Sequence, residues 1–252
     1  MSRKLAMGLL ATAVLGLAPA AWAAAVPAAI TAAVADKTRP EADTKRDADR
    51  KPAEVMAFIG LKPGDKVVDM IPGGGYFTRL FSDVVGPKGA VYAYTPAEFA
   101  KFSKAGLPAN GAHPDAARPN ITFLTSPMNA FSAPEKVDVV WTSQNYHDLH
   151  DSFAAPSDLA VINKQVFAAL KPGGVYVVLD HSAVAGSGLT ATDTLHRIDA
   201  ATVRKEVEAA GFKFDGESKA LANPADPRTA SVFDASIKGK TDQFIYRFRK
   251  PK

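Results

Sequence analysis

Residues 67–78 have the sequence VVDMIPGGGYFT, an apolar run that ends in an acid and a triple glycine. The run has the composition of a buried strand, and residues 76–85 have the periodicity of a helix. Gly73, Gly74 and Gly75 connect the two, and adjacent glycines let a ligand approach bare backbone. The free N–H groups at the start of the helix point toward this loop. The stretch therefore predicts a ligand-binding turn between a strand and a helix.

Apolar runs of this kind recur along the rest of the chain. Strands are expected at residues 66–70, 90–94, 121–125, 137–142 and 175–180. Most of these runs are continuously apolar, as in parallel strands that are covered on both faces. Helical patterns lie between several of them, and residues 243–249 (QFIYRFR) alternate apolar and charged residues. The pattern predicts an α/β fold, a Rossmann-like and mostly parallel sheet with helices on both faces and an antiparallel last strand.

The composition excludes several classes of protein. The chain has 252 residues, of which 47% are hydrophobic, and this is enough for one full core. It has no cysteine, which excludes disulfides, thiolate metal sites and cysteine nucleophiles. Its 30 basic and 26 acidic residues give a net charge of +4, too small for the basic footprint of a nucleic-acid-binding protein. We therefore expect no nucleic-acid partner.

The N-terminus has the three parts of a secretory signal peptide. A basic start precedes an apolar run over residues 5–17, and a small-x-small pattern ends near Ala23. The predicted parts of the chain are a signal peptide, a flexible Ala/Pro-rich linker and a single folded domain, at residues 1–23, 24–40 and 41–252. An uncleaved membrane anchor is the alternative, but Pro19 and Pro27 interrupt the run before the roughly 20 residues that a span needs. The sequence thus predicts an exported, periplasmic protein with no stable membrane insertion.

The stretch VVDMIPGGGYFT resembles the first motif of class I S-adenosylmethionine-dependent methyltransferases, in which an acid ends the first strand and a glycine loop follows. The resemblance covers about residues 52–250, and more specifically the chain is similar to predicted methyltransferases of bacteria that carry an exported N-terminus. It implies that Asp69 organises the loop and that Gly73 and Gly75 lie against the amino-acid end of the cofactor, with Gly74 between them in the predicted cofactor-binding set. On this basis we expect a methyltransferase-like domain that takes S-adenosylmethionine as its cofactor.

The rest of the cofactor site is expected after the second, third and fourth strands. In the resembled family an acid at the end of the second strand binds the ribose, but this chain has Tyr94 at that place, and Glu98 is the nearest acid. Glu98 either replaces that acid or is an ordinary acid of a first helical turn, where the helix dipole favours it. The resemblance places Asn129 near the adenine and Asn145 near the cofactor or the acceptor. These four residues complete the predicted cofactor-binding set.

Histidines gather where the fourth and fifth strands end. The sequence WTSQNYHDLHD occupies residues 141–151, and Asp180 and His181 follow the fifth strand. In the resembled fold this edge faces the methyl group, and methyl transfer requires alignment of the acceptor and removal of its proton where it has one. His147, with Asp148 beside it, has the chemistry of a base near neutral pH. The predicted catalytic residues are Tyr146, His147, Asp148 and His181.

A metal site is the weaker interpretation of these residues. Histidines three apart share a helical face, which would suit metal ligands. The candidate ligands are His147, His150 and His181, with Asp148 or Asp180. Spacing alone does not establish such a set, so we expect no metal. A surface or helix-capping role is the simpler interpretation of His150 and His196, although the place of His196 before the last helix also allows it to converge on the same edge.

The sequence therefore predicts an S-adenosylmethionine-dependent methyltransferase, a transferase of one-carbon groups, that acts on an unknown small-molecule acceptor. The alternative is a non-catalytic periplasmic binding or accessory protein that retains the methyltransferase fold and holds another nucleoside-like or small ligand. Hydrolysis with a serine nucleophile is not expected, because the chain has no G-x-S-x-G motif.

Overall fold

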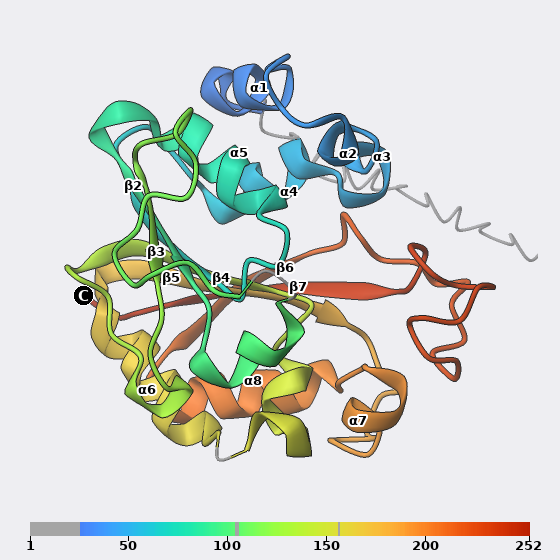
Figure 1. Cartoon of the computed structure of the whole chain (residues 1–252). Helices are drawn as coiled ribbons and strands as arrows, with labels where there is room; N and C mark the ends of the chain where they lie inside the picture. The colour runs from blue at the N-terminus through green and yellow to red at the C-terminus, as the bar shows by residue number, and fades with distance from the viewer. Residues whose placement is uncertain (1–25, 104–105, 156) are drawn as a thin grey trace, which may run out of the picture.

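The computed structural model describes residues 26–103, 106–155 and 157–252, which form a central sheet between two helical layers (Figure 1). The strands stand in the order β3-β2-β1-β4-β5-β7-β6. Neighbouring strands are parallel except at β7, which is antiparallel to both β5 and β6. The strands are β1 (Lys66–Met70), β2 (Ala90–Tyr94), β3 (Ile121–Leu124), β4 (Val137–Ser143), β5 (Leu170–His181), β6 (Lys213–Ser218) and β7 (Gln243–Arg249). The predicted mostly parallel α/β sheet with an antiparallel last strand is confirmed.

Helices cover both faces of the sheet. The α-helices are α1 (Ala28–Val34), α2 (Glu41–Thr44), α3 (Asp47–Arg50), α4 (Pro52–Ile59), α5 (Tyr76–Val85), α6 (Leu159–Ala169), α7 (Thr192–Leu195) and α8 (Ala200–Ala209). Short 3-10 helices lie between them, namely η1 (Gly86–Lys88), η2 (Ala97–Phe102), η3 (Met128–Ala130), η4 (His147–His150) and η5 (Ser152–Ala154). In Figure 1, α1, α4 and α5 lie on one face of the sheet, and α6 and α8 lie on the other.

The sheet is buried on both faces, which explains its continuously apolar strands. Val67 of β1 packs in the core beneath α1, α4 and α5, whereas its neighbour Val68 packs in the core beneath α6 and α8. Both side chains are fully buried. Because alternate residues of a strand point to opposite faces, each central strand supplies apolar residues to both cores. Complete burial of one such side chain stabilises the fold by about 1.5–3 kcal/mol.

Helix α5 holds the glycine loop in place, because it begins at Tyr76, directly after Gly75. Its Phe77 and Phe81 pack edge-on against Trp141 of β4, with ring centroids 4.8 and 5.8 Å apart. Trp141 is fully buried. This aromatic packing ties the start of α5 to β4, and β1 and β4 are neighbours in the sheet. The loops that follow β1 and β4 therefore lie side by side.

Within the predicted flexible linker of residues 24–40, the described residues 26–40 include a helix that packs against the domain, so this part of the prediction is corrected. Residues 28–34 form α1, and its Ile30 is fully buried against α4 and α5. Further along, Arg39 donates to both carboxylate oxygens of Asp47, at 2.7 and 2.8 Å. A seven-residue helix that is mostly alanine has too little periodicity to be recognised in sequence. Tertiary contacts, among them the burial of Ile30 and the Arg39–Asp47 ion pair, give this segment its structure.

Strand β6 is an element that the sequence analysis does not predict. Its residues are half-buried or exposed, and at Gly216, where φ is 131°, its register with β7 shifts. A strand without an apolar run gives little signal in sequence, because strand preference depends largely on burial. The chain between β6 and β7 consists of turns, in line with the irregular composition of residues 223–236.

The predicted signal peptide, residues 1–23, lies outside the described part of the chain. Within that part, no helix combines the length and the apolar character needed to cross a membrane.

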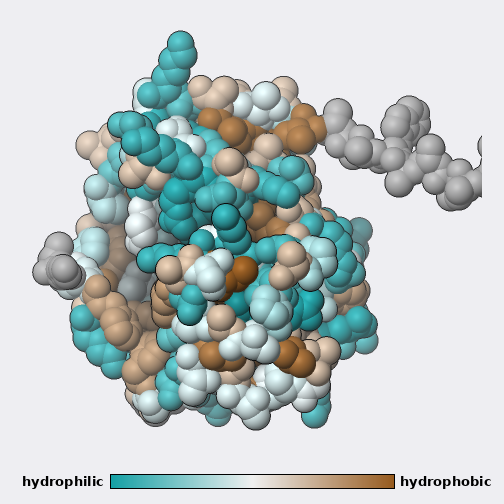
Figure 2. All heavy atoms as spheres, turned by 90° about the vertical axis from the view of Figure 1, so that its right-hand side faces the viewer, coloured by the Kyte–Doolittle hydropathy of each residue, from teal (hydrophilic) through white to brown (hydrophobic). Residues whose placement is uncertain are grey.

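The carboxyl ends of the parallel strands meet at one edge of the sheet, on the right in Figure 1, where the loops after β1, β4, β5 and β6 gather. Figure 2 looks at this edge and shows a largely polar surface with a few separate hydrophobic groups. Ligands of open α/β sheets bind at this edge, next to the point where the strand order reverses. In this sheet the order reverses between β1 and β4.

Candidate functional site

The loop after β1 leaves its backbone open to a ligand. Gly73 and Gly75 have φ of 56° and 76°, in the left-handed region that favours glycine. A Cβ placed on Gly73 or Gly74 would meet no described atom within 4 Å. On Gly75 the same Cβ would come within 2.9 Å of the Arg79 guanidinium. The backbone conformation thus favours glycine at positions 73 and 75, and Gly73 and Gly74 face open space.

Three cavities lie along this edge of the sheet. The Asp69 cavity has a volume of about 200 Å³, and Asp69 and Gly73 are among its lining residues. The Phe99 cavity, of about 660 Å³, is also lined by Gly73. The His181 cavity, of about 430 Å³, shares Arg50 with the Asp69 cavity. The three cavities therefore adjoin one another, with the Asp69 cavity in the middle.

Asp69, at the end of β1, is almost fully buried beside the glycine loop. Its carboxylate accepts a hydrogen bond from Thr78 Oγ1 at 2.6 Å. Burial raises the pKa of Asp69 to about 7, and the Thr78 hydrogen bond and the charge of Arg50 offset only part of this effect. The carboxyl group is thus close to half-protonated at neutral pH. A cation that enters the cavity would favour its ionised form.

Arg50 is a cation of the Asp69 cavity that the sequence analysis does not single out. Its Cζ lies 4.8 and 5.7 Å from the ring centroids of Tyr76 and Phe77. The guanidinium donates to Gln144 Oε1 at 3.3 Å, and its Nε is buried with no hydrogen-bond partner among the described residues. Burial lowers the pKa of Arg50 to about 10, so the group stays charged at neutral pH. The structure thus holds a stacked guanidinium with an unused donor in the cavity wall.

Two more charged residues of the N-terminal segment line the Asp69 cavity. Asp43 accepts hydrogen bonds from Nε and Nη2 of Arg79, at 2.7 and 2.9 Å, and Arg79 also donates to Gly74 O. Arg46 lines both the Asp69 cavity and the His181 cavity. In the sequence, these two residues belong to the charge-rich run EADTKRDADR at residues 41–50, which is the one local pattern that could have pointed to them. Such a run is usually a solvated face, so the sequence alone did not identify it as part of a site.

The His181 cavity has an apolar wall and several basic groups. Its apolar lining residues are Phe77, Leu179, Leu221, Val232 and Phe233, and its charged ones are Arg46, Asp49, Arg50 and Lys238. The Nδ1 atom of His181 lies 2.8 Å from Thr241 Oγ1. Burial lowers the pKa of His181 to about 4, although Asp180 opposes this, so the imidazole is neutral at pH 7. The cavity suits a small molecule with an apolar body.

His147 lies behind this cavity, with its ring centroid 6.1 Å from that of His181. Its Nδ1 and its backbone N–H each donate to a carboxylate oxygen of Asp180, both at 2.8 Å. Its Nε2 lies 3.2 Å from Asp148 Oδ1 and 3.3 Å from His196 Nδ1. Burial lowers the pKa of His147, but Asp180 and Asp148 outweigh it and raise the pKa to about 10. His147 therefore carries its proton at neutral pH and is not a free base.

The structure brings several of the predicted site residues together at the glycine loop. Asp69, Gly73, Gly74 and Asn145 line the same cavity. Asn145 Nδ2 donates to the backbone oxygen of Ile71 at 3.1 Å, which joins the loop after β4 to the loop after β1. Gly75 lines the Phe99 cavity, and His181 lines the cavity named after it.

Tyr94 and Glu98, predicted near the ribose, are turned away from the cavities. Both carboxylate oxygens of Glu98 accept from the backbone N–H of Met128, at 3.1 Å. Tyr94 Oη donates to the backbone oxygen of Ser126 at 3.1 Å. Both residues thus hold the loop after β3. The acid that does line the Phe99 cavity is Asp115, which the sequence analysis does not name.

Asn129 and Tyr146 also lie outside the three cavities. Asn129 Oδ1 accepts from the backbone N–H of Asp158 at 2.9 Å and so caps the region where α6 begins. Tyr146 Oη donates to Glu206 and accepts from Asn163 Nδ2, both at 2.9 Å, in the layer of α6 and α8. The side chain of Tyr146 is fully buried. Asn129 thus fixes the start of α6, and Tyr146 joins the loop after β4 to α6 and α8.

Comparison with known proteins identifies the fold of this chain, through similar solved structures. No protein-family model matches the sequence, and a search of curated proteins found no match. An S-adenosylmethionine-dependent methyltransferase from Aquifex aeolicus is 19% identical with a TM-score of 0.51, and the match covers 84% of this chain and 99% of that one. Another, from Mesorhizobium loti, is 19% identical with a TM-score of 0.51, over 80% of this chain and 98% of that one. The [4+2]-cyclase SpnF is 17% identical with a TM-score of 0.54, over 85% of each chain.

At these identities the similarity concerns the fold. Two of the three proteins are methyltransferases by name and the third is a cyclase, so the fold alone does not determine the reaction. The chain has the fold of S-adenosylmethionine-dependent methyltransferases.

Proposed function

We propose that this protein is an S-adenosylmethionine-dependent methyltransferase that acts on a small acceptor. The observation that carries the proposal is the Asp69 cavity, where bare glycine backbone, carboxylates and guanidinium groups line the same space. The amino-acid end of S-adenosylmethionine bears both an ammonium and a carboxylate, so its site needs groups of both charges. The fold shared with methyltransferases supports the same assignment.

The residues of the Asp69 cavity fit that zwitterionic end. Arg50 would hold the carboxylate, because a guanidinium binds carboxylates through paired hydrogen bonds and its Nε has an unused donor. Asp69 would face the ammonium group, whose charge favours the ionised carboxylate. Gly73 and Gly74, which have open space where a Cβ would stand, would allow the ligand to approach the backbone.

The Phe99 cavity would take the adenosine part of the cofactor. It shares Gly73 with the Asp69 cavity, so a long ligand can extend from one into the other. Phe99 and Phe123 are among its lining residues, and aromatic faces suit a purine ring. Asp115 would then take the part of the ribose-binding acid that the resemblance leads one to expect after β2.

When bound, S-adenosylmethionine supplies a methyl group on a cationic sulfonium. The residues of the chain would align the acceptor with it. Ser143 and Gln144 line both the Asp69 cavity and the His181 cavity, so an acceptor in the second cavity would lie next to the first. Alignment is the main contribution that such a displacement requires. The neutral imidazole of His181 would offer the acceptor a hydrogen-bond partner, whereas His147 already carries its proton.

Calorimetric titration with S-adenosylmethionine and S-adenosylhomocysteine tests the cofactor site. Gly74→Leu should weaken binding at least about 100-fold, because its side chain would fill the cavity without a strained backbone. Ala201→Leu adds the same side chain on an exposed position of α8 and should leave binding unchanged. Absence of any heat from the wild-type protein at millimolar ligand would exclude the cofactor. Unchanged binding by the Gly74 variant would place the cofactor elsewhere.

A measurement of methyl transfer distinguishes the proposed enzyme from a non-catalytic binding protein. Incubation with methyl-labelled cofactor and fractionated small molecules of bacterial cells should give a labelled product that depends on the protein. Binding of the cofactor without any labelled product would favour the non-catalytic binding protein with the same fold.

We also propose that the protein is exported. The support is the basic start, the apolar run and the small-x-small pattern of residues 1–23. A fusion of residues 1–30 to alkaline phosphatase, which is active only after export, should give active enzyme in bacteria. An inactive fusion that accumulates in the cytoplasm would overturn this proposal.

A further inference from the structure

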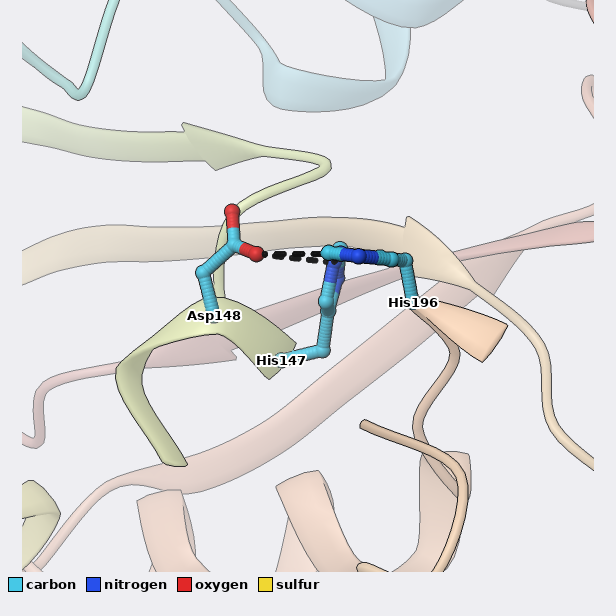
Figure 3. A group of neighbouring side chains, drawn as sticks. All are labelled: His147, Asp148 and His196. Atoms are coloured by element: carbon cyan, nitrogen blue, oxygen red, sulfur yellow. Dashed lines mark hydrogen bonds and ion pairs between the residues drawn. The ribbon is translucent and has the colours of Figure 1, made fainter. Parts of the chain in front are cut away.

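At the carboxyl edge of the sheet, three side chains direct a nitrogen or oxygen atom that can bind a metal toward the same point (Figure 3). His147 Nε2 lies 3.3 Å from His196 Nδ1 and 3.2 Å from Asp148 Oδ1. The third side of the triangle, from His196 Nδ1 to Asp148 Oδ1, measures 3.4 Å. His147 and Asp148 belong to η4, after β4, whereas His196 follows α7, some fifty residues further along the chain.

The size of this triangle matches a tetrahedral metal site. Zinc binds imidazole nitrogen and carboxylate oxygen at about 2.0–2.2 Å, which places neighbouring ligands of a tetrahedron about 3.3–3.6 Å apart. The three observed separations lie within about 0.1 Å of that range. Two histidines and one carboxylate also form a ligand set typical of divalent transition metals, which leaves a fourth position for water or another ligand.

The other nitrogen of His147 has the partner that metal-binding histidines usually have. Its Nδ1 donates to Asp180 Oδ1 at 2.8 Å. Asp180 is fully buried and is held in turn by the backbone N–H groups of His147 and His181, at 2.8 and 2.7 Å. A carboxylate in this position fixes the imidazole tautomer and orientation so that Nε2 faces the metal.

The surroundings of the triangle favour a cation. Asp151 is buried, and its carboxylate interacts with Thr192, His147 and Asp148. The carboxylates of Asp148, Asp151 and Asp180 therefore surround two imidazoles. The side chains of Asp148 and His196 are 15% and 26% exposed, which gives an ion access from solvent.

The backbone conformation of His196 is uncommon for a residue other than glycine, which is consistent with a position that is kept because of what its side chain contacts. Its φ is 53°, in the left-handed region where residues other than glycine are uncommon. The imidazole packs edge-on against Phe233, a residue of the His181 cavity, with ring centroids 4.8 Å apart. The triangle is thus one side chain away from that cavity.

We propose that His147 Nε2, Asp148 Oδ1 and His196 Nδ1 form a binding site for a divalent transition-metal cation, with zinc the best match in size and ligand chemistry. His150 and His181, which the spacing in sequence made candidates, are not part of it. His150 Nε2 pairs with Glu206, and His181 Nδ1 pairs with Thr241.

The test is a titration of metal-stripped protein with zinc chloride, followed by calorimetry, without any methyl donor. One equivalent should bind, and magnesium, which prefers oxygen ligands, should not compete. His196→Asn removes one ligand and retains a residue that tolerates positive φ, and Asp148→Asn removes the charged ligand at nearly constant shape. Each should weaken zinc binding by at least about 100-fold, more than the 10- to 100-fold expected from loss of an outer partner such as Asp180→Asn.

Cobalt provides a second readout that does not depend on affinity alone. The wild-type protein with one equivalent of Co²⁺ should show the intense visible absorption of tetrahedral cobalt, and the His196 variant should lose it. His113→Ala removes a histidine outside the site, whose Nδ1 contacts a backbone oxygen of β3, and should bind zinc like the wild type. Circular dichroism in the presence of a chelator checks that each variant is folded.

The outcomes separate this site from the proposed methyltransferase. A wild-type protein that binds no zinc, or variants that bind it unchanged, would show that the triangle is only a hydrogen-bonded cluster. Failure of cofactor binding with intact zinc binding would overturn the methyltransferase and leave the metal site in place. The two measurements use different ligands and different variants, so neither result decides the other.

Discussion

At the scale of single residues, Arg50 is the side chain whose role the structure changes most. It lies at the end of the charge-rich run of residues 41–50, before α4, and in the fold it stacks on Tyr76 and Phe77 with a buried, unused Nε. A guanidinium held by two aromatic rings is already ordered before a ligand arrives. Little side-chain entropy is then lost when a carboxylate binds.

Arg50→Met should weaken the binding of S-adenosylhomocysteine by about 10- to 100-fold, because one hydrogen bond to a charged group contributes about 1.5–3 kcal/mol. The variant keeps a side chain of similar length over the two rings. Calorimetry with 5′-methylthioadenosine, which lacks the carboxylate, supplies the control and should give the same affinity for both proteins. Equal losses for the two ligands would indicate a general disturbance of the cavity.

Asp69→Asn should change how stability depends on pH. Burial raises the pKa of Asp69 to about 7 in the folded chain, from the ordinary 3.8. The folded state therefore binds the proton more tightly than the unfolded state, and the contribution of Asp69 to the free energy of unfolding decreases as pH rises from about 4 to about 7. Above pH 7 it is constant. An asparagine has no such dependence.

Urea unfolding of both proteins at pH 5 and pH 7.5 measures this effect. The free energy of unfolding of the asparagine variant, relative to the wild type, should rise between the two pH values. The difference between variant and wild type removes the contribution of the other titrating groups. A constant difference over this range would mean that Asp69 is ionised throughout.

At the scale of elements, α1 shows how a weak sequence pattern becomes a fixed helix. Its residues are mostly alanine, and only Ile30 and Ala33 are buried. Isolated helices this short are not stable in water, so packing rather than propensity holds α1 in place. Ile30 fills a fully buried position against α4 and α5.

Ile30→Ala should lower the free energy of unfolding by about 2–5 kcal/mol, the usual effect of emptying a buried isoleucine site. Thr31→Ala, at an exposed position of the same helix, should change it by less than about 0.5 kcal/mol. Chemical denaturation monitored by circular dichroism gives both values. Equal stability of the two variants would show that α1 is not docked in solution.

The elements differ in how far the sequence could predict them. Strands β1, β2 and β4 were predictable because both of their faces are buried, which leaves a continuous apolar run. Strand β6 is largely half-buried and acidic, and α1 has only two buried residues, so neither leaves a pattern. For these elements tertiary contacts decide the structure, and no local sequence signal records them.

The same reasoning applies to the candidate site. The placement of Asp69 and of the glycine loop could be predicted, because local sequence determines a strand, a turn and a helix. The place of His196 before the last helix allowed it to reach the same edge, but its contact with His147 could not be predicted, because it depends on the path of the chain between β5 and α8. The spacing in η4 suggested His150 as the partner of His147, but His150 Nε2 lies 3.2 Å from Glu206 Oε2 of α8 instead, a contact between distant segments that local spacing does not record.

At the scale of the whole molecule, two separate groups of residues occupy one edge of the sheet. The Asp69 cavity lies between the glycine loop and the N-terminal segment, whereas the histidine triangle lies between η4 and α7. The His181 cavity lies between them, since Arg50 and Gln144 belong to its wall on one side and Phe233 touches His196 on the other. An acceptor in that cavity would contact walls that both groups hold in place.

The position of β7 has a consequence for how the chain acquires its structure during synthesis. Of the seven strands of this sheet it is the last to leave the ribosome, yet it stands between β5 and β6 and bonds to both. Until residues 243–249 emerge, β5 lacks a neighbour on one side and β6 has no place in the sheet. A nascent polypeptide of this protein thus lacks a complete sheet until residues 243–249 have emerged, and a chain in that state is open to any factor that must engage it unfolded.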